Sequence, residues 1–227
     1  MKEFSEIFNE IVSGIDRTIT ITSKSSNQYS VKSLKWARAG KFVRGYDSLG
    51  NLQTKKITAI NGNVLVLSDS TIVSDSLILD EPFNITGTRL ATNLEWTRAD
   101  IDLFNKTPLI WLLDNYTETI FGRGDSRERE VNFTIFFLDE TNIKDFYTSE
   151  HKSEVVSPMI KLSEQFIDVI NQKPKFKALE LVNKRDLTKF GTETQNGFEA
   201  NILDANLSGT SITFNLTKYK EPTTCLT

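Results

Sequence analysis

The sequence is poor in the residues that metal proteins and nucleophilic enzymes use for chemistry. Among its 227 residues there are one cysteine, Cys225, and one histidine, His151. Any zinc site built mainly from these two residue types is therefore excluded. A cysteine nucleophile activated by histidine would require Cys225 and His151 to meet. Cys225 also has no partner for a disulfide within the chain, which is typical of a protein kept in a reducing compartment.

Long apolar runs are missing as well. No stretch of about 18 apolar residues occurs, so the sequence predicts no membrane-spanning helix and no membrane partner. The first fifteen residues carry Glu3, Glu6 and Glu10. A secretory signal instead has a basic start followed by an unbroken apolar stretch. We therefore expect a protein that is made and kept inside a cell.

Catalytic motifs are scarce. The sequence contains no GxxxxGK[ST] or GxGxxG phosphate loop and no GxSxG nucleophile turn. Carboxylates stand at both ends of the segment 130–139, but a strand from Glu130 to Asp139 is about 30 Å long, too far for a shared two-metal site. His151 stands among charged residues near a helix start, where a helix-end or interface role is the simplest interpretation. The sequence thus predicts no catalytic residue, no cofactor and no metal site, and it favours binding or assembly over catalysis.

The apolar residues that are present first follow a helical pattern and then alternate. Residues 4–15 have the three-and-four spacing of one helical face, ended near Gly14. Segments 17–22, 29–34, 41–46 and 55–60 alternate as short strands do. Asn61-Gly62, between two such segments, is a typical two-residue hairpin turn. We therefore expect residues 16 to about 80 to form a small antiparallel barrel or sandwich.

Beyond Pro82 and Gly87 the pattern changes again. Residues 107–116 are a continuous apolar run behind a proline, typical of a strand buried on both faces, and residues 131–139 predict the strongest strand. Helices are expected at 88–104, near 142–147, and over 149–171, where Pro158 marks a start or a kink. Closing strands are expected at 177–184, 198–207 and 211–219.

These patterns predict an α+β fold in two parts. Residues 1–87 would form an N-terminal helix and a basic β subdomain. Residues 88–227 would form an antiparallel sheet with helices packed on one face and a short flexible C-terminal tail.

Charge divides the chain in the same way. Residues 17–56 hold nine basic residues and one acid, a net +8, while the whole chain carries −3, so the remainder carries −11. Within this segment basic residues alternate with Trp36, Phe42 and Tyr46. Three interpretations stay open: a solvated strand face with aromatics in the core, a basic docking face for protein, or a nucleic-acid-binding surface. The residues of this basic set are Lys32, Lys35, Arg38, Lys41 and Arg44.

The C-terminal half resembles a known group of proteins. Pro108 opens the buried strand of TPLIWLLD, Asp125-Ser126-Arg127-Glu128 opens the main strand, and Phe136-Phe137-Leu138-Asp139 closes it. Glu150-His151 through Pro158-Met159 then lead into the long helix. In this order the segments resemble the ring-forming tail-completion, or tail-terminator-like, proteins of tailed bacteriophages. The resemblance covers about residues 105–217, and residues 16–87 depart from it.

The resemblance implies a structural role. It implies a homo-oligomeric ring, a hexamer or a dodecamer, at the neck or tail of a virion, made in the host bacterial cytoplasm. Neighbouring portal, ring or tail proteins would be its partners, and DNA in the lumen could make passive contact. The segment GRGDSRERE would then be a mixed-charge connection able to pair across a subunit boundary. Its candidate inter-subunit contacts are Arg123, Asp125, Arg127, Glu128, Arg129 and Glu130. The alternative function is a nucleic-acid-binding module that uses residues 17–56.

Overall fold

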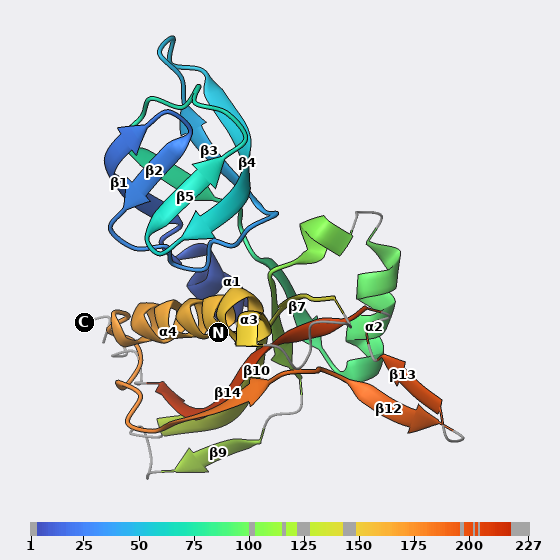
Figure 1. The fold of residues 1–227 in the computed structure, drawn as a ribbon. Coiled ribbons are helices and arrows are strands. Elements are labelled where there is room, and N and C mark those ends of the chain that lie inside the picture. The colour runs from blue at the N-terminus through green and yellow to red at the C-terminus, as the bar shows by residue number, and fades with distance from the viewer. Residues whose placement is uncertain are drawn as a thin grey trace, which may run out of the picture.

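The chain folds into two β structures with helices between them. The structure is a computed structural model, and it describes residues 4–99, 103–114, 117–121, 128–142, 149–195, 198–201, 203 and 205–218. A closed barrel lies at one end and an extended sheet at the other, and the helices α1 (Phe4–Ser13) and α4 (Ser157–Asn171) lie between them (Figure 1). The expected α+β class is confirmed, including the N-terminal helix and the barrel.

Six short strands form the barrel. Their order is β1-β2-β5-β4-β3-β6, and β6 pairs with β1 to close it, with every pairing antiparallel. Closure removes the open edges that a sheet of this size would otherwise expose. The strands are β1 (Thr18–Ser25), β2 (Gln28–Val31), β3 (Phe42–Tyr46), β4 (Leu52–Asn61), β5 (Val64–Leu67) and β6 (Ser76–Leu79).

The barrel interior follows from the alternation of its strands. One side chain in two points inward, so β-branched and leucine side chains fill the centre. Tyr29 also lies inside, where its hydroxyl donates to the carbonyl of Ile72 at 3.0 Å. Gly45 is required by the same packing, because a Cβ there would lie 2.6 Å from Cγ2 of Ile72. The enclosed aliphatic side chains include Ile19, Val43, Ile57, Leu65, Leu67 and Leu77.

The hairpin expected at Asn61-Gly62 connects β4 to β5. Gly62 has a φ of 59°, a conformation that glycine adopts without a steric penalty. The pairing of Asn61 with Val64 closes the turn. The sequence therefore placed the hairpin correctly, but its two turn residues are Gly62 and Asn63, one position later than the expected Asn61-Gly62.

The second sheet is built around two long strands. β10 (Glu128–Glu140) and β14 (Leu207–Lys218) pair over twelve residues, and the sheet order is β11-β14-β10-β8-β7, with β9 beside β10. The outer strands are β7 (Phe83–Gly87), β8 (Leu109–Leu113), β9 (Glu118–Phe121) and β11 (Val182–Leu187). A separate hairpin consists of β12 (Thr192–Gln195) and β13 (Phe198–Asn201).

The sheet is mixed rather than antiparallel. β7 runs parallel to β8, with Phe83 opposite Leu109. A parallel pair needs a crossover connection, and here the crossover contains α2 (Arg89–Arg98) and a 3₁₀ turn at Leu103–Lys106. The expectation of a wholly antiparallel sheet was wrong because the sequence contains no local signal for which strand β7 joins.

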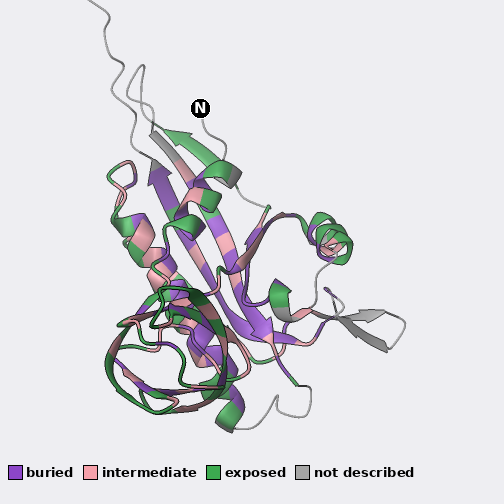
Figure 2. Ribbon diagram, turned by 90° about the horizontal axis from the view of Figure 1, so that it is seen from above, coloured by how far each residue is buried: buried purple, intermediate pink, exposed green. Residues whose placement is uncertain are grey.

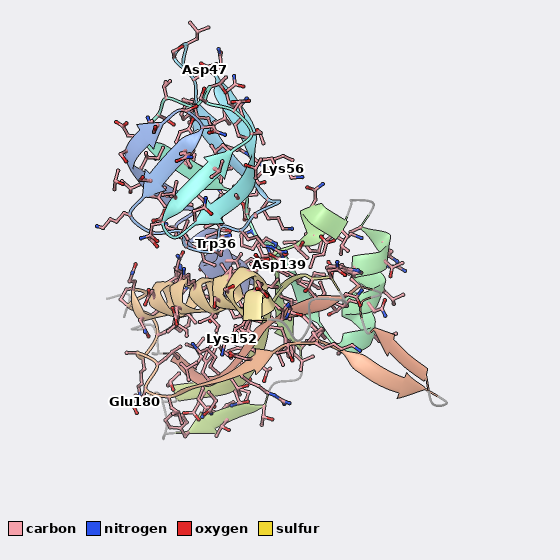
Figure 3. The ribbon with its side chains drawn as sticks, in the orientation of Figure 1. Trp36, Asp47, Lys56, Asp139, Lys152 and Glu180 are labelled. Carbon is pink, nitrogen blue, oxygen red and sulfur yellow. The ribbon has the colours of Figure 1, made fainter. Side chains whose placement is uncertain are left out.

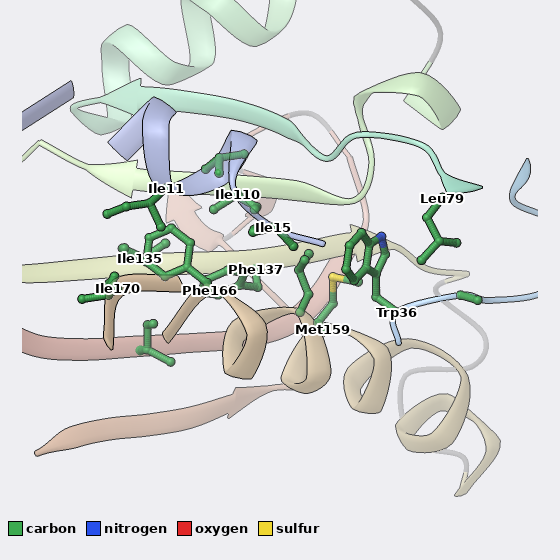
Figure 4. Packing of buried hydrophobic residues seen from close by; sticks show 14 of the residues in the cluster. Ile11, Ile15, Trp36, Leu79, Ile110, Ile135, Phe137, Met159, Phe166 and Ile170 are labelled. Carbon is green, nitrogen blue, oxygen red and sulfur yellow. The ribbon is translucent and has the colours of Figure 1, made fainter. Parts of the chain in front are cut away.

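Helices cover both faces of this sheet, not one. α1 and α4 pack on the face that carries Phe137, whose ring lies 5.5 Å from that of Phe166 (Figure 4). Trp96 of α2 belongs to a second cluster with Trp111 and Leu138 on the opposite face. The larger cluster continues from α1 and α4 into the barrel. β7 and α1, both within residues 1–87, thus contact the second sheet and its helices.

The long helix is interrupted where the sequence suggested. A short helix, α3 (Ser149–His151), is followed by a π-helical stretch, Lys152–Val156, and then by α4. Pro158 occupies the first turn of α4, a position that needs no backbone N–H donor. The helix expected near 142–147 lies mostly outside the described residues. The strand expected at 177–184 begins later, at Val182.

Candidate functional site

The most enclosed charged group that the structure describes lies between the barrel and the sheet. Asp139, near the end of β10, is 1% exposed. Nη1 of Arg38 lies 3.0 Å from its Oδ2, and Nζ of Lys41 lies 3.4 Å from its Oδ1. Figure 3 shows Asp139 at the junction of the two β structures. One buried carboxylate thus receives two cations from the barrel.

Further hydrogen bonds complete this junction. Arg38 donates to the carbonyl of Glu140 at 2.6 Å, and Lys41 donates to the carbonyl and the hydroxyl of Thr107 at 3.0 and 2.6 Å. Burial lowers the pKa of the Lys41 ammonium, although Asp139 acts in the opposite direction. Such an arrangement positions two parts of a fold, because removal of the carboxylate would leave two largely buried cations without it.

The basic set expected to form a docking face is therefore mostly engaged within the chain. Lys35 contacts Asp16 at 2.6 Å, and Arg44 contacts Asp80 at 2.7 Å. Arg38 and Lys41 are directed into the junction, and Lys32 is exposed. The structure does not bring the five basic side chains together as one free face. Nucleic-acid binding by the barrel stays a prediction, to be tested by the salt dependence of its affinity.

The three aromatic residues of the same segment differ in how deeply they are buried. Trp36 is buried in the main core, Phe42 is half-buried and Tyr46 is exposed. Only Trp36 matches the interpretation in which aromatics fill the core while basic groups face solvent.

The residues expected at a subunit boundary lie at the start of β10. Arg123, Asp125 and Arg127 lie outside the described residues. The backbones of Glu128 and Arg129 pair with Phe121 and Ile120 of β9. These pairings place β9 directly beside the expected boundary segment.

Glu130, the last of that set, is engaged in its own sheet. Its carboxylate accepts hydrogen bonds from Nδ2 of Asn215 at 3.0 Å and from the hydroxyl of Thr217 at 3.5 Å. Asn132 in turn donates to Asn215 at 2.7 Å, and Thr134 contacts Thr213 at 3.2 Å. These residues form a polar cross-strand ladder on the sheet face opposite α4.

This polar ladder forms the floor of an open groove. The groove has a volume of about 470 Å³ and is lined by β9, β10, β14 and the segment 177–183. Phe121 and Leu181 line it together with the polar floor. Both are exposed large apolar side chains, at 41% and 70%. No sequence pattern indicates this groove, because its two sides are about sixty residues apart in the chain.

Exposed apolar side chains gather in three places in the described part of the chain. One is the tip of the β3–β4 hairpin, where Leu49 is 84% exposed, and a second is the outer face of α2. The third is the edge formed by β9 with Leu181. Figure 2 shows β9 as an exposed strand beside largely buried ones. The residues are Tyr46, Leu49, Leu52, Val73, Leu90, Leu94, Ile120, Phe121 and Leu181.

His151 has a structural position. It is 2% exposed, and its Nδ1 lies 3.1 Å from the hydroxyl of Thr141. This contact ties the start of the long helix to the end of β10. Among the described residues, no three His, Cys, Asp or Glu side chains are grouped closely enough to hold a metal ion.

Comparisons add no family to this description. No protein-family model matches the chain, and a search of curated proteins also found no match. Within the described residues, no helix combines the length and apolarity that crossing a membrane requires. The fold and its surfaces define an α+β protein with a barrel, a mixed sheet and an exposed sheet edge.

Proposed function

We propose that this chain is a non-enzymatic structural protein of a tailed-bacteriophage virion, a subunit of a ring at the neck or tail that joins portal or head to tail components. The proposal rests on two different sheet edges, one at β9 and one at β11, as surfaces for contact between subunits. A subunit that uses two different surfaces makes heterologous contacts, which close into rings when the rotation allows it.

The observation that carries the proposal is the pair of sheet edges at β9 and β11. In the described part of the chain no strand pairs with the outer side of either one. β9 has all four side chains exposed, including Ile120 at 54%. Open sheet edges that carry exposed apolar side chains are candidate surfaces for contact with another chain.

The resemblance of residues 105–217 supports the same function. Its segments lie on β8, β10 and the helix that ends in α4, which together form the sheet and its helical cover. Pro108 stands just before β8, and Pro158 stands in the first turn of α4. The resemblance therefore concerns one packed unit of the fold rather than scattered segments.

Native mass spectrometry of the purified chain at moderate salt tests this proposal. We expect species with six or twelve times the mass of the 25.8 kDa subunit, and we expect the protein in purified virions. A chain that stays monomeric at high concentration and is missing from virions would contradict the proposal.

A further inference from the structure

The open groove over the polar ladder has the size and position of a ligand-binding site. Its volume of about 470 Å³ lies within the range of about 300 to 1,000 Å³ that is typical of small-molecule sites. Its floor is part of the sheet face that looks away from α4 and the barrel (Figure 1). The neighbouring part of that face, around Phe136 and Leu138, is covered by the second apolar cluster. The groove therefore begins where the apolar packing of this face ends.

Alternation along the strands brings polar side chains to the floor. Val131 and Phe133 of β10 belong to the core under α1 and α4. Because successive side chains of a strand point to opposite faces, the residues between and beside them face the groove. Residues opposite each other in the ladder share a face. The floor therefore consists of three cross-strand pairs, which are Glu130 with Thr217, Asn132 with Asn215, and Thr134 with Thr213.

Contacts within the floor fix the orientation of its amides. A carboxylate only accepts hydrogen bonds, so Nδ2 of Asn215 is the atom that faces Glu130, at 3.0 Å. Oδ1 of Asn215 then faces the other way and accepts from Nδ2 of Asn132 at 2.7 Å. The hydroxyl of Thr217 lies 3.5 Å from the second carboxylate oxygen. These groups are thus held in one orientation before any ligand binds, which lowers the entropy cost of binding.

The same contacts leave hydrogen-bonding capacity for a ligand. An amide side chain has two N–H donors and an oxygen with two lone pairs. The ladder uses one N–H of Asn132 and one N–H of Asn215, and both residues are exposed. Each carboxylate oxygen of Glu130 accepts one hydrogen bond in the ladder and has a second lone pair. The floor therefore offers donors and acceptors side by side to a ligand in the groove.

Apolar side chains stand at the two sides of this polar floor. Thr119 of β9 is paired with Glu130, so Phe121, two residues further along the strand, points to the groove face. Leu181 stands on the other side, just before β11, and both residues line the groove. Both are exposed. An aromatic ring beside fixed polar groups can pack against C–H groups of a ligand while the polar groups bind its hydroxyls.

The lining disfavours the other common classes of ligand. Its described residues include two carboxylates, Glu130 and Glu180, and one ammonium, Lys177, so a polyanion such as a nucleic acid would meet net repulsion. An apolar ligand would remove water from the polar floor without replacing its hydrogen bonds. An extended peptide joins a sheet through the backbone groups of an open edge. In this floor those backbone groups are already paired between β10 and β14.

We propose that this groove binds neutral carbohydrate, either a short oligosaccharide or a stretch of a polysaccharide. Each sugar hydroxyl both donates and accepts, and adjacent hydroxyls therefore match the fixed amides and the carboxylate of the floor. The C–H face of a sugar ring is apolar and suits the exposed ring of Phe121. This binding activity goes beyond the ring function proposed above and does not depend on it.

A glycan array tests the inference. The labelled full-length chain is applied to immobilised neutral oligosaccharides, and a glycan that retains it is titrated in solution by isothermal titration calorimetry. We expect at least one neutral glycan to bind with an affinity that does not change with salt, because no phosphate is neutralised. Retention by none of the glycans would overturn the inference. A single-stranded oligonucleotide or a peptide that binds when no glycan does would overturn it as well.

Substitutions in the groove locate the site. Asn132→Ala removes an exposed amide from β10, and Phe121→Ala removes the aromatic ring of β9. Each should weaken sugar binding by about tenfold, the size expected when a ligand loses hydrogen bonds or a ring contact. Ile120→Ala is the matched control, because Ile120 is also an exposed apolar residue of β9 but points to the opposite face. This control should change the affinity by no more than about twofold.

The outcomes separate this inference from the ring function. Sugar binding that Asn132→Ala and Phe121→Ala both leave unchanged would place the sugar elsewhere on the chain and overturn the inference. Circular dichroism shows whether each variant keeps its fold, and the two substitutions lie on different strands, so either one alone tests the site. Rings that bind no sugar would overturn this inference alone, and a monomer that binds sugar would contradict the ring function alone.

Discussion

The guanidinium of Arg38 lies 3.0 Å from the carboxylate of Asp139, although 101 residues separate the two in the chain. Arg38 belongs to the barrel segment between β2 and β3, and Asp139 lies near the end of the central strand β10. With Lys41 on the other carboxylate oxygen, this contact fixes the barrel relative to the sheet. Arg38 and Lys41 thus stabilise the contact between the barrel and the sheet, and they do not belong to a free basic surface.

Replacing Asp139 with Asn should therefore destabilise the protein strongly. Arg38 and Lys41 would keep their charges in a mostly buried site without the carboxylate. We expect the free energy of unfolding to fall by about 3 kcal/mol, measured by urea denaturation at pH 7. Arg44→Gln is the matched control, because its ion pair with Asp80 is far more exposed and should change stability by no more than about 0.5 kcal/mol. Equal effects of the two substitutions would contradict a junction role.

Helix α1 should be essential to the stability of the second sheet, although the barrel strands lie between the two in the sequence. Phe8 is 2% exposed, and its ring lies 6.0 Å from that of Phe166 in α4. We expect Phe8→Ala to lower the free energy of unfolding by about 3 to 5 kcal/mol. Glu6→Ala, on the exposed side of the same helix, should have little effect. A barrel that unfolds in the Phe8→Ala variant together with the sheet, seen as one transition by tryptophan fluorescence and circular dichroism, would show that the shared core is cooperative.

The carboxyl of Asp69 should titrate at unusually low pH. A hydrogen bond from Lys55, aided by bonds from the backbone and hydroxyl of Thr71, lowers its pKa from 3.8 to about 2. Because the pKa is lower in the folded state, the stabilisation is present above pH about 4 and is lost as the pH falls through about 2. NMR titration of the Asp69 side chain measures the midpoint. In Lys55→Met it should move toward 3.8, and an unchanged midpoint would show that Lys55 is not the main cause.

Local patterns were sufficient for much of the fold. The spacing of Phe8 and Ile11 predicted α1, alternation predicted most barrel strands, and Asn61-Gly62 predicted the hairpin. Pro108 before an apolar run correctly indicated a buried strand, and Pro158 marked the beginning of α4. In each case the signal lies within a few residues of the element, where propensity and periodicity act directly.

Long-range relationships were not accessible in this way. Nothing near Asp139 indicates that Arg38 and Lys41 reach it, and nothing near Phe83 indicates a parallel partner. The shared groove of Phe121 and Leu181 depends on the order of strands between them. β12 was also missed, because it is polar and only four residues long, whereas β13 lies at the start of the strand expected at 198–207. These features are set by tertiary packing, which a single sequence does not display.

Low-resolution electron microscopy of the purified protein tests the central claim most directly. We predict closed rings with six or twelve subunits in which adjacent subunits are joined through their sheets, with the barrels as separate lobes. Single, unassociated chains at every concentration, or rings in which neighbouring subunits touch only through their barrels, would contradict the account.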